Sequence, residues 1–497
     1  MNVSLNELTG NIRHLNIEWP TLRVYGMIHL NRSGAMSFQY DDRIHAGLKN
    51  CFDSGRTRPV GWRIAQLEGL ESFLREREES IAGALHADLR KPASETFLTE
   101  TGWLLSEIRH VRKHLRRWMK PRRVSVPLHY QPGRAWVSRE PLGVVLIIGA
   151  WNYPLQLCLA PLIGAVAGGN CALVKPSEMA PETSSLLASE LLHYLDKDAF
   201  RVVEGGPELT REILRHRFDH IFFTGSRAKG RDVMQAAARL ITPVTLELGG
   251  KCPCIVTEKA DLRIAARRIV WGKFLNAGQT CISPDYLLVQ ESVEAPLLRL
   301  MREALDLFYG PDPRESPDYA RIVDDRQFRR LSCYLQEGEL VAGGQSCGAD
   351  RYVAPTIIRG VRPGSPLMQE EVFGPVLPVI TVSSLQEATE IVRAGSEPLA
   401  VYLFSRDPDE LAMVEERTQS GGVCCNDLLF QASVMGLPFG GRGMSGTGAY
   451  HGRAGFDTFT VPRSVLVRSG FPDPDLRYPP YGSGKMRLLR RIINLFA

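Results

Sequence analysis

The chain of 497 residues has few of the features that mark disulfide-stapled or nucleic-acid-binding proteins. Its ten cysteines include no CxxC pair and no regular ladder, which indicates a reduced, intracellular setting. The 60 Lys+Arg against 55 Asp+Glu leave a net charge of only +5, too little over this length to indicate nucleic acid. Cys252 and Cys254, like Cys424 and Cys425, have no neighbouring cluster of Cys or His, so we expect buried small hydrophobes and no metal site.

The sequence also has little that indicates a leader or a membrane span. Residues 1–38 contain no apolar core of signal-peptide length, so secretion is not expected. The one long run without charge covers residues 141–174. Within it, 143–149 is typical of a strand, 155–168 of a buried helix and 171–174 of a second strand. This order predicts a βαβ unit whose sheet is covered on both faces, rather than a membrane helix.

The sequence is rich in apolar residues arranged in alternating patterns. Hydrophobic residues make up 44% and charged residues 23%, so large cores can form. At roughly 100–200 residues per domain, the length predicts two to four domains. Helical spacing covers residues 42–89 and about 95–119, and strands then alternate with helices from 141 to 247 and again from 248 to 425. We therefore predict an α/β fold with parallel sheets.

Two basic segments stand out, and contact with a membrane surface is one of several interpretations for each. The helix over 95–119 ends in a run of Lys and Arg with no acid before Glu140. This is typical of a solvated helix end, with a membrane-surface patch as the sharper alternative. After an extended spacer from residue 471, residues 485–497 form a short basic amphipathic helix, too short to span a bilayer. This helix can lie on a membrane, cap a groove of its own chain or pack on a subunit, and the sequence leaves all three open.

Three short motifs carry candidate chemistry. Residues 223–230 (FTGSRAKG) follow an apolar strand, and a glycine turn there lets backbone N–H groups approach a phosphate. Cys281 follows a helix beside Gly278. It is a nucleophile only where its surroundings favour the thiolate, and a packed thiol is the alternative. Glu247 ends an apolar strand, where burial would raise its pKa towards that of a general base, and a surface acid is the alternative.

Several motifs follow one another in a fixed order, and their combination is specific. In chain order they are AWNYP (150–154), KPSE (175–178), FTGS (223–226), LELGGK (246–251), GQTC (278–281), EEVFGP (370–375) and LPFGG (437–441). From about residue 40 to 470 the chain resembles an aldehyde dehydrogenase. The motifs CISPDY (281–286), YVAPT (352–356) and GAYHG (448–452) resemble the class 3 branch, which includes fatty aldehyde dehydrogenases.

The resemblance implies the catalytic roles of three residues. Cys281 would attack the aldehyde carbonyl, and the Asn152 side chain together with the Cys281 backbone N–H would hold the oxyanion. Oxidation would leave a thioester, which water activated by Glu247 would hydrolyse to the carboxylic acid. The chain would therefore be an NAD(P)-dependent aldehyde dehydrogenase.

The resemblance also implies a set of cofactor contacts. Lys175 and Glu178 would bind the adenosine ribose, Glu371 the nicotinamide ribose, and Phe373 would lie against the nicotinamide ring. The turn near the pyrophosphate would contribute Thr224, Gly225, Ser226 and Gly230. A carboxylate at Glu178 would accept hydrogen bonds from ribose hydroxyls and repel a 2′-phosphate, so NAD is favoured and NADP is possible.

The domain organisation follows from the same resemblance. It implies a doubly wound, Rossmann-like cofactor domain, an α/β catalytic domain, bridging or oligomerisation strands, and a homodimer. An N-terminal extension over 1–38 has no counterpart in the family. The predicted boundaries are 39–123 with 141–247 for the cofactor domain, 248–425 for the catalytic domain, 124–140 with 426–470 for the bridging segment, and 471–497 for the spacer and basic helix.

Three residues near the expected substrate entrance depart from the family pattern and bear on the identity of the aldehyde. Gln431 and Met435 stand where class 3 relatives commonly carry histidines, and Arg442 stands where a small apolar residue is usual. In relatives the tail lies near the substrate entrance or anchors the enzyme to a membrane, and this resemblance favours a medium- or long-chain aliphatic or an aromatic aldehyde. We expect a cytoplasmic enzyme that can contact a membrane surface peripherally. Two alternatives are a dehydrogenase that passes the thioester to coenzyme A and a non-catalytic protein that binds aldehydes or a membrane surface on the same fold.

Overall fold

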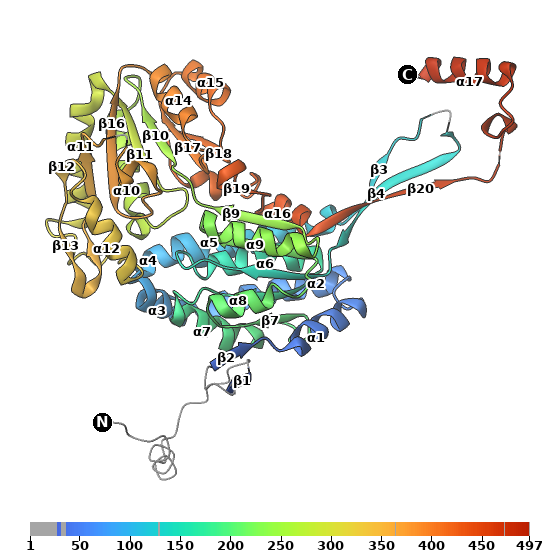
Figure 1. The fold of residues 1–497 in the computed structure, drawn as a ribbon, viewed down its shortest axis with the longest axis horizontal. Helices are drawn as coiled ribbons and strands as arrows, with labels where there is room; N and C mark the ends of the chain where they lie inside the picture. The colour runs from blue at the N-terminus through green and yellow to red at the C-terminus, as the bar shows by residue number, and fades with distance from the viewer. Residues whose placement is uncertain (1–26, 31–35, 128–129, 363, 472, 497) are drawn as a thin grey trace, which may run out of the picture.

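The computed structural model describes residues 27–30, 36–127, 130–362, 364–471 and 473–496. Two lobes are each built on a mainly parallel β-sheet, and an arm of strands projects from one of them (Figure 1). The predicted α/β class is confirmed. Most of the predicted N-terminal extension lies outside the described residues, which include only the antiparallel pair β1 (Met27–Leu30) and β2 (Met36–Gln39) from this end.

The first lobe contains a six-stranded sheet in the order β19-β9-β8-β5-β6-β7. All its neighbours are parallel except β19, which is antiparallel to β9. The strands are β5 (Val144–Ile148), β6 (Cys171–Lys175), β7 (Phe200–Val202), β8 (His220–Gly225), β9 (Val244–Leu248) and β19 (Gly446–Thr447). The strand order reverses between β5 and β8, since the chain runs from β5 outward to β7 and then returns to β8 on the other side of β5.

The uncharged run of the sequence forms β5, helix α6 (Gln156–Gly168) and β6. Every residue of the two strands is buried, and α6 is apolar all round because it packs on the sheet and under α2 and α5. The predicted βαβ unit is confirmed. Within the described ranges, no helix combines the length and the apolar character that crossing a bilayer requires.

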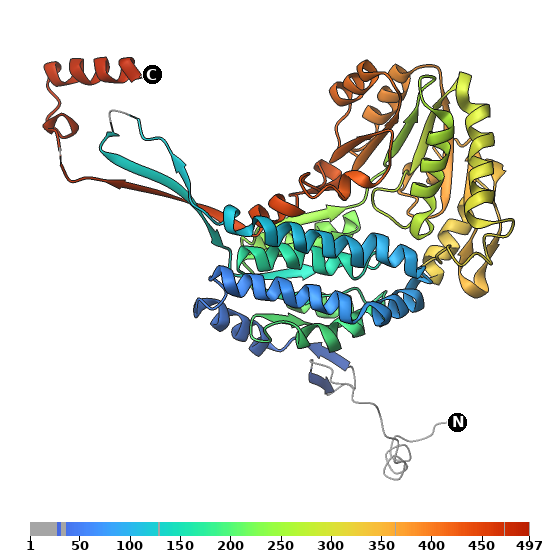
Figure 2. The ribbon, with the colours of Figure 1, turned by 180° about the vertical axis from the view of Figure 1, so that it is seen from behind.

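The remaining helices of this lobe surround the sheet. Helix α1 contacts β5 and β6, α9 contacts β8 and β9, and α16 packs on α6 (Figure 2). A short π-helical turn, η1 (Phe97–Thr101), interrupts the long helical stretch between α4 and α5. The helices are α1 (Asp42–Asp53), α2 (Val60–Glu76), α3 (Glu78–Leu89), α4 (Ala93–Thr96), α5 (Gly102–Trp118), α7 (Pro181–Glu190), α8 (Pro207–Ile213), α9 (Arg227–Arg239) and α16 (Gly452–Thr458).

The second lobe contains a seven-stranded sheet in the order β12-β15-β16-β11-β10-β17-β18, parallel except for β12. Its strands are β10 (Pro253–Val256), β11 (Tyr286–Gln290), β12 (Glu339–Ala342), β15 (Thr356–Arg359), β16 (Val376–Val382), β17 (Ala400–Phe404) and β18 (Gly422–Cys425). Its helices are α10 (Leu262–Phe274), α11 (Glu291–Tyr309), α12 (Asp325–Tyr334), α13 (Pro366–Gln369), α14 (Leu385–Ala394) and α15 (Pro408–Arg417). A small ladder pairs β13 (Ser346–Cys347) with β14 (Tyr352–Val353).

The projecting arm is an antiparallel sheet of β3 (Arg122–Val124), β4 (Gly133–Pro141) and β20 (Thr460–Arg468). Both views place helix α17 (Ser483–Phe496) beyond the arm and away from the two lobes (Figures 1 and 2). Leu488 and Ile493 of α17 are exposed. The predicted C-terminal helix is therefore present, with apolar side chains that the described part of the chain leaves uncovered.

Candidate active site

The carboxyl ends of four parallel strands of the first lobe lie along one sheet edge. The register places Ile148 of β5 beside both Lys175 of β6 and Phe223 of β8, and Phe223 beside Leu246 of β9. Ligands bind at such an edge where the strand order reverses, because the loops there separate. The sequence motifs that follow these strands are therefore brought together, although they lie far apart in the chain.

The candidate nucleophile Cys281 lies in a tight turn of the second lobe. After α10 ends, Asn276, Ala277 and Gly278 have φ of 53°, 50° and 71°, a left-handed run that redirects the chain. A Cβ atom on Gly278 would lie 2.3 Å from the carbonyl oxygen of Gly374, so the turn packs directly on the loop that carries Glu371.

Asn152 links the two lobes at this turn. Its side chain is buried, and its Nδ2 donates to the carbonyl oxygen of Gln279 at 3.1 Å. Its own carbonyl oxygen accepts from Asn276 Nδ2 at 2.8 Å. An amide nitrogen carries two N–H groups, so one remains for a further acceptor beside Cys281.

Glu247 lies on β9, opposite Thr224 of β8 and Gly446 of β19. It is buried, so the alternative of a surface acid is wrong. Neither carboxyl oxygen has a hydrogen-bond partner within the described ranges. This burial raises the pKa of Glu247 well above its ordinary value of 4.5, because a charged carboxylate there would lack solvation.

The electrostatics of Cys281 connect it to two of the predicted carboxyls. Its side chain is partly accessible, but the surrounding protein desolvates the thiol and raises its pKa to about 12. Negative charge on Glu371 and on Glu247 adds to the shift. Cys281 is therefore a neutral thiol in this arrangement at neutral pH, and its reaction requires a group that accepts the proton.

Polar groups at the ends of β6 and β8 form a candidate cofactor cradle. Lys175 is buried, and its Nζ donates to Glu178 Oε2 at 3.1 Å, while the Glu178 side chain stays 42% exposed and available to a ligand. Ser226 caps the thirteen-residue helix α9, whose first N–H groups face this edge. Thr224 Oγ1 is buried and has no partner among the described residues. The close packing of α9 depends on Gly230, where a Cβ atom would lie 2.6 Å from Leu248 Cδ2.

Glu371 and Phe373 reach the same edge from the second lobe. Glu371 Oε1 accepts from the backbone N–H of Gly250 at 3.2 Å. Burial and the charge of Asp285 raise the pKa of Glu371 to about 8. Phe373 has a φ of 44° and meets Trp151 edge to face at 5.3 Å.

The predicted residues come from both lobes, and the contacts of Asn152 with Gln279 and of Glu371 with Gly250 join the two groups. Lys175, Thr224, Gly225, Ser226, Gly230, Asn152 and Glu247 come from the first lobe, and Cys281, Glu371 and Phe373 from the second. Motif analysis missed a buried pair, Lys91 and Glu100, that contacts the Asn152 turn. Neither residue belongs to a motif with a chemical signature, and only their shared burial reveals them.

A comparison with protein-family models identifies the family to which this chain belongs. The model of the aldehyde dehydrogenase family matches residues 35–465. The chain belongs to the aldehyde dehydrogenase family. The ordered motifs predicted this family from the sequence, and the prediction is confirmed.

The curated relatives place this aldehyde dehydrogenase close to family 3. Aldehyde dehydrogenase family 3 member B1 of the rat (Rattus norvegicus) is 45% identical over 452 residues, which cover 90% of this chain and 96% of the relative. The dimeric NADP-preferring aldehyde dehydrogenase of the dog (Canis lupus familiaris) is 46% identical over 86% of this chain and 95% of its own. A substrate-bound structure of Staphylococcus aureus AldH superposes with a TM-score of 0.89 at 40% identity, covering 91% of this chain and 99% of that one. The enzyme is an NAD(P)-dependent aldehyde dehydrogenase that oxidises an aldehyde to the carboxylic acid.

The two predictions about paired cysteines have different outcomes. Cys252 and Cys254 are buried, as expected, in the apolar core of the second lobe. The expectation that Cys424 and Cys425 are buried is wrong, since both are only half-buried at the edge strand β18. Throughout the part of the chain that the structure describes, no group of His, Cys, Asp and Glu is arranged to hold a metal ion.

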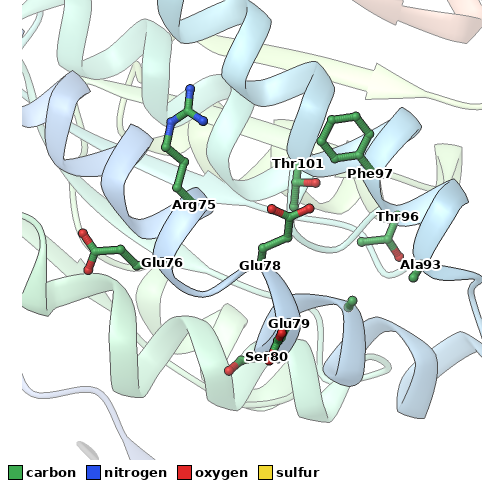
Figure 3. Close-up of a pocket in the computed structure, with 10 residues that line it drawn as sticks. Arg75, Glu76, Glu78, Glu79, Ser80, Ala93, Thr96, Phe97 and Thr101 are labelled. Carbon is green, nitrogen blue, oxygen red and sulfur yellow. The ribbon is translucent and has the colours of Figure 1, made fainter.

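A surface cavity of about 540 Å³ lies apart from the predicted site residues of the dehydrogenase (Figure 3). Its walls come from the junction of α2 and α3 and from η1, including Glu78, Phe97 and Thr101. A second cavity, of about 320 Å³, lies beside His110 and Trp118. Neither cavity is lined by Cys281, Glu247 or a predicted cofactor contact.

The position of Glu371 depends on a glycine, which yields a first prediction. A Cβ atom on Gly249 would lie 2.0 Å from Glu371 Oε2, and Gly249 does not need a positive φ. Gly249→Ala should therefore displace the carboxylate without breaking the backbone. If Glu371 binds the cofactor, the loss of about 1–2 kcal/mol of hydrogen bonding should weaken NADH binding roughly tenfold.

Titration of NADH fluorescence measures this binding directly. Gly83→Ala is the matched control, because nothing lies within 4 Å of a Cβ atom at that position of α3. Unchanged NADH affinity in Gly249→Ala would show that Glu371 does not bind the cofactor.

Proposed function

We propose that Cys281, Asn152 and Glu247 carry the oxidation. In this proposal the Cys281 thiol releases its proton to solvent water, and its sulfur attacks the aldehyde carbon. The Asn152 Nδ2 and the Cys281 backbone N–H then donate to the oxygen on which negative charge develops. The observation that supports these roles most strongly is the hydrogen bond from Asn152 Nδ2 to the carbonyl oxygen of Gln279, which holds the amide two residues from Cys281.

Glu247 serves as the base that activates water for hydrolysis of the thioester. Its two carboxyl oxygens have no partner among the described residues and can accept from a water molecule, and burial raises its pKa, which strengthens it as a general base. After the oxidation, Cys281 carries a thioester, Glu247 takes a proton from water, and the resulting hydroxide attacks the thioester carbon. The carboxylic acid leaves, and the thiol of Cys281 is restored.

The residues of the cradle suit NAD(P). Thr224 Oγ1 lacks a partner within the described ranges, and the α9 N-terminus offers N–H groups to a phosphate. Lys175 and Glu178 would hold the adenosine ribose, Glu371 the nicotinamide ribose, and Phe373 would limit the movement of the ring. When bound, NAD(P) supplies the two-electron acceptor that the oxidation requires. The Glu178 carboxylate favours NAD, while the dog relative is described as NADP-preferring.

We also propose the class of substrate and the assembly. The similarity to family 3 and the exposed apolar residues of helix α17 support an apolar, medium- or long-chain aliphatic or aromatic aldehyde. A homodimer is supported by the dog relative, which is described as dimeric. Its interface would include the arm of β3, β4 and β20.

The products of a single assay test the proposed function. A series of straight-chain and aromatic aldehydes is incubated with NAD or NADP, in the presence and absence of coenzyme A. The proposal requires one carboxylic acid for each NADH or NADPH formed. A coenzyme A thioester as the main product would instead favour the acylating alternative, and cofactor binding without any turnover would favour the non-catalytic one.

The tail helix α17 gives a second prediction, on membrane contact. Its exposed Leu488 and Ile493 alternate with basic residues such as Arg487 and Arg490, a composition that binds the surface of anionic bilayers. Replacing Leu488 and Ile493 with serine should remove most co-sedimentation with vesicles that contain phosphatidylserine, and leave the oxidation of short aldehydes unchanged.

Leu307→Ser provides the matched control, since Leu307 is 67% exposed on α11 and lies in the second lobe. If the tail variant sediments like the wild type, the helix has a structural role and the proposed membrane contact is wrong.

A further inference from the structure

A buried ion pair lies directly behind the Asn152 turn. Lys91 follows the end of α3, and Glu100 lies in the π-helical turn η1. Lys91 Nζ and Glu100 Oε1 are 2.5 Å apart, and both side chains are fully buried. Taking two charges out of water costs more than an apolar pair of the same size would, so such a pair needs further hydrogen bonds to persist.

Those hydrogen bonds go to one short segment, residues 152–156. Lys91 Nζ donates to the carbonyl oxygen of Asn152 at 3.2 Å and lies 4.2 Å from the centre of the Tyr153 ring. Glu100 Oε2 accepts from the backbone N–H groups of Leu155 and Gln156, both at 3.0 Å. The ion pair therefore contacts four of the five consecutive residues that contain Asn152.

The turn that carries the nucleophile holds the same segment. Asn276 Nδ2 donates to the carbonyl oxygen of Asn152 at 2.8 Å, and the Tyr153 hydroxyl lies 2.6 Å from Thr280 Oγ1. Thr280 immediately precedes Cys281. Lys91 and Asn276 thus donate to the same carbonyl oxygen of Asn152, so the ion pair and the turn that presents the thiol together fix its backbone.

We infer that Lys91 and Glu100 are positioning residues for the oxyanion contact of Asn152. This inference rests on the role proposed above for Asn152. Lys91 fixes the Asn152 carbonyl, and Glu100 holds the first backbone N–H groups of α6 and neutralises the lysine. An oxyanion donor acts only when it is already in place as charge develops, so a small displacement of the Asn152 backbone lowers the rate of the chemical step.

The test compares two neutral double variants. Lys91→Met with Glu100→Gln removes the lysine's hydrogen bond to the Asn152 carbonyl oxygen, keeps that of Asn276, and leaves neither member of the pair charged. The new amide oxygen at position 100 can still accept from the backbone N–H groups of Leu155 and Gln156. Lys91→Gln with Glu100→Gln keeps a donor near the Asn152 carbonyl. The probe is hydrolysis of para-nitrophenyl acetate, which acylates the thiol and needs no cofactor.

We expect the methionine variant to lower kcat roughly tenfold to a hundredfold, less than the ~10²–10³-fold loss when an oxyanion donor itself is removed. KM and the NADH dissociation constant should change little. The glutamine variant should recover part of the loss. Lys49→Met with Asp53→Asn makes the same change of charge at an ion pair of α1 and should behave as wild type.

A double-mutant cycle with Asn152→Ala separates positioning from a general structural effect. If Lys91 and Glu100 act through Asn152, their replacement should add almost nothing in the Asn152→Ala background. Multiplicative losses in the cycle, or wild-type kcat in the methionine variant, would overturn the inference. Failure of the wild type itself to oxidise aldehydes would instead contradict the proposed function. Should the methionine variant not fold, the glutamine variant passes through the same cycle.

Discussion

Replacing Cys281 with serine is expected to lower aldehyde oxidation by ~10⁴-fold or more, since loss of a covalent nucleophile removes the reaction path itself. The serine hydroxyl loses its proton far less readily than the thiol, and the site already holds the pKa of the thiol at about 12. Because serine differs from cysteine by one atom, the turn at Gly278 and the packing around it should persist. NADH formation with a saturating aldehyde measures the loss.

Two measurements make this result specific to the nucleophile. The Cys281→Ser variant should bind NADH with nearly wild-type affinity, because the predicted cofactor contacts lie on other residues. Cys333→Ser is the control for a thiol on the surface, as Cys333 is exposed on α12. Turnover of Cys281→Ser within tenfold of the wild type would show that Cys281 is not the nucleophile.

The second large effect is expected from Glu247→Gln. Removing a general base costs ~10²–10⁴-fold, and here the loss should fall on hydrolysis of the thioester. One equivalent of NADH should therefore form rapidly before turnover slows. Glutamine has nearly the same shape as glutamate. Its introduction breaks no hydrogen bond to the described residues, since neither oxygen of Glu247 has a partner among them.

The pH dependence of the wild type has a definite sign. The active form of a base is the deprotonated one, and burial raises the pKa of Glu247 well above 4.5. Turnover should fall as the pH falls through that raised pKa, and the fall should disappear in Glu247→Gln. Glu204→Gln, at an exposed position after β7, is the matched control. A variant at Glu247 with wild-type turnover would exclude this residue as the base.

The strand and helix pattern of the sequence indicates, for a physical reason, which motifs meet at the carboxyl edge of the first-lobe sheet. Strands alternating with helices form parallel sheets, and parallel strands bring their carboxyl ends to one edge. The motifs at Lys175, Ser226 and Glu247 each follow or end such a strand, so their convergence followed from the pattern. The burial of Glu247 followed as well, because its neighbours on β9 are apolar.

Other features could not be derived, because they depend on contacts distant in the sequence. Nothing near Gly446 indicates that this segment adds β19 to the first sheet opposite Glu247. The partner of Lys91 is only nine residues away, yet an ion pair on a helical stretch is usually exposed, and its burial depends on α6 and the Asn152 turn. The half-exposure of Cys424 and Cys425 depends on β18 being an edge strand of the second sheet.

The structure places two of the residues that depart from the family pattern, Gln431 and Arg442. Gln431 Nε2 donates to the Tyr402 hydroxyl at 3.0 Å, and that hydroxyl donates to the carbonyl oxygen of Ile282 at 2.7 Å. Gln431 is thus connected through Tyr402 to Ile282, the residue that follows Cys281. Arg442 is exposed in the loop before β19.

If the oxidation passes through an acyl group on Cys281, that group can be trapped. The Glu247→Gln variant is mixed with NAD and a medium-chain aldehyde and quenched in acid, and the adduct is mapped by mass spectrometry. We expect one acyl group per chain, on the peptide that contains Cys281, formed together with one NADH. NADH without an adduct, or an acyl group on another residue such as Cys252, would contradict this expectation.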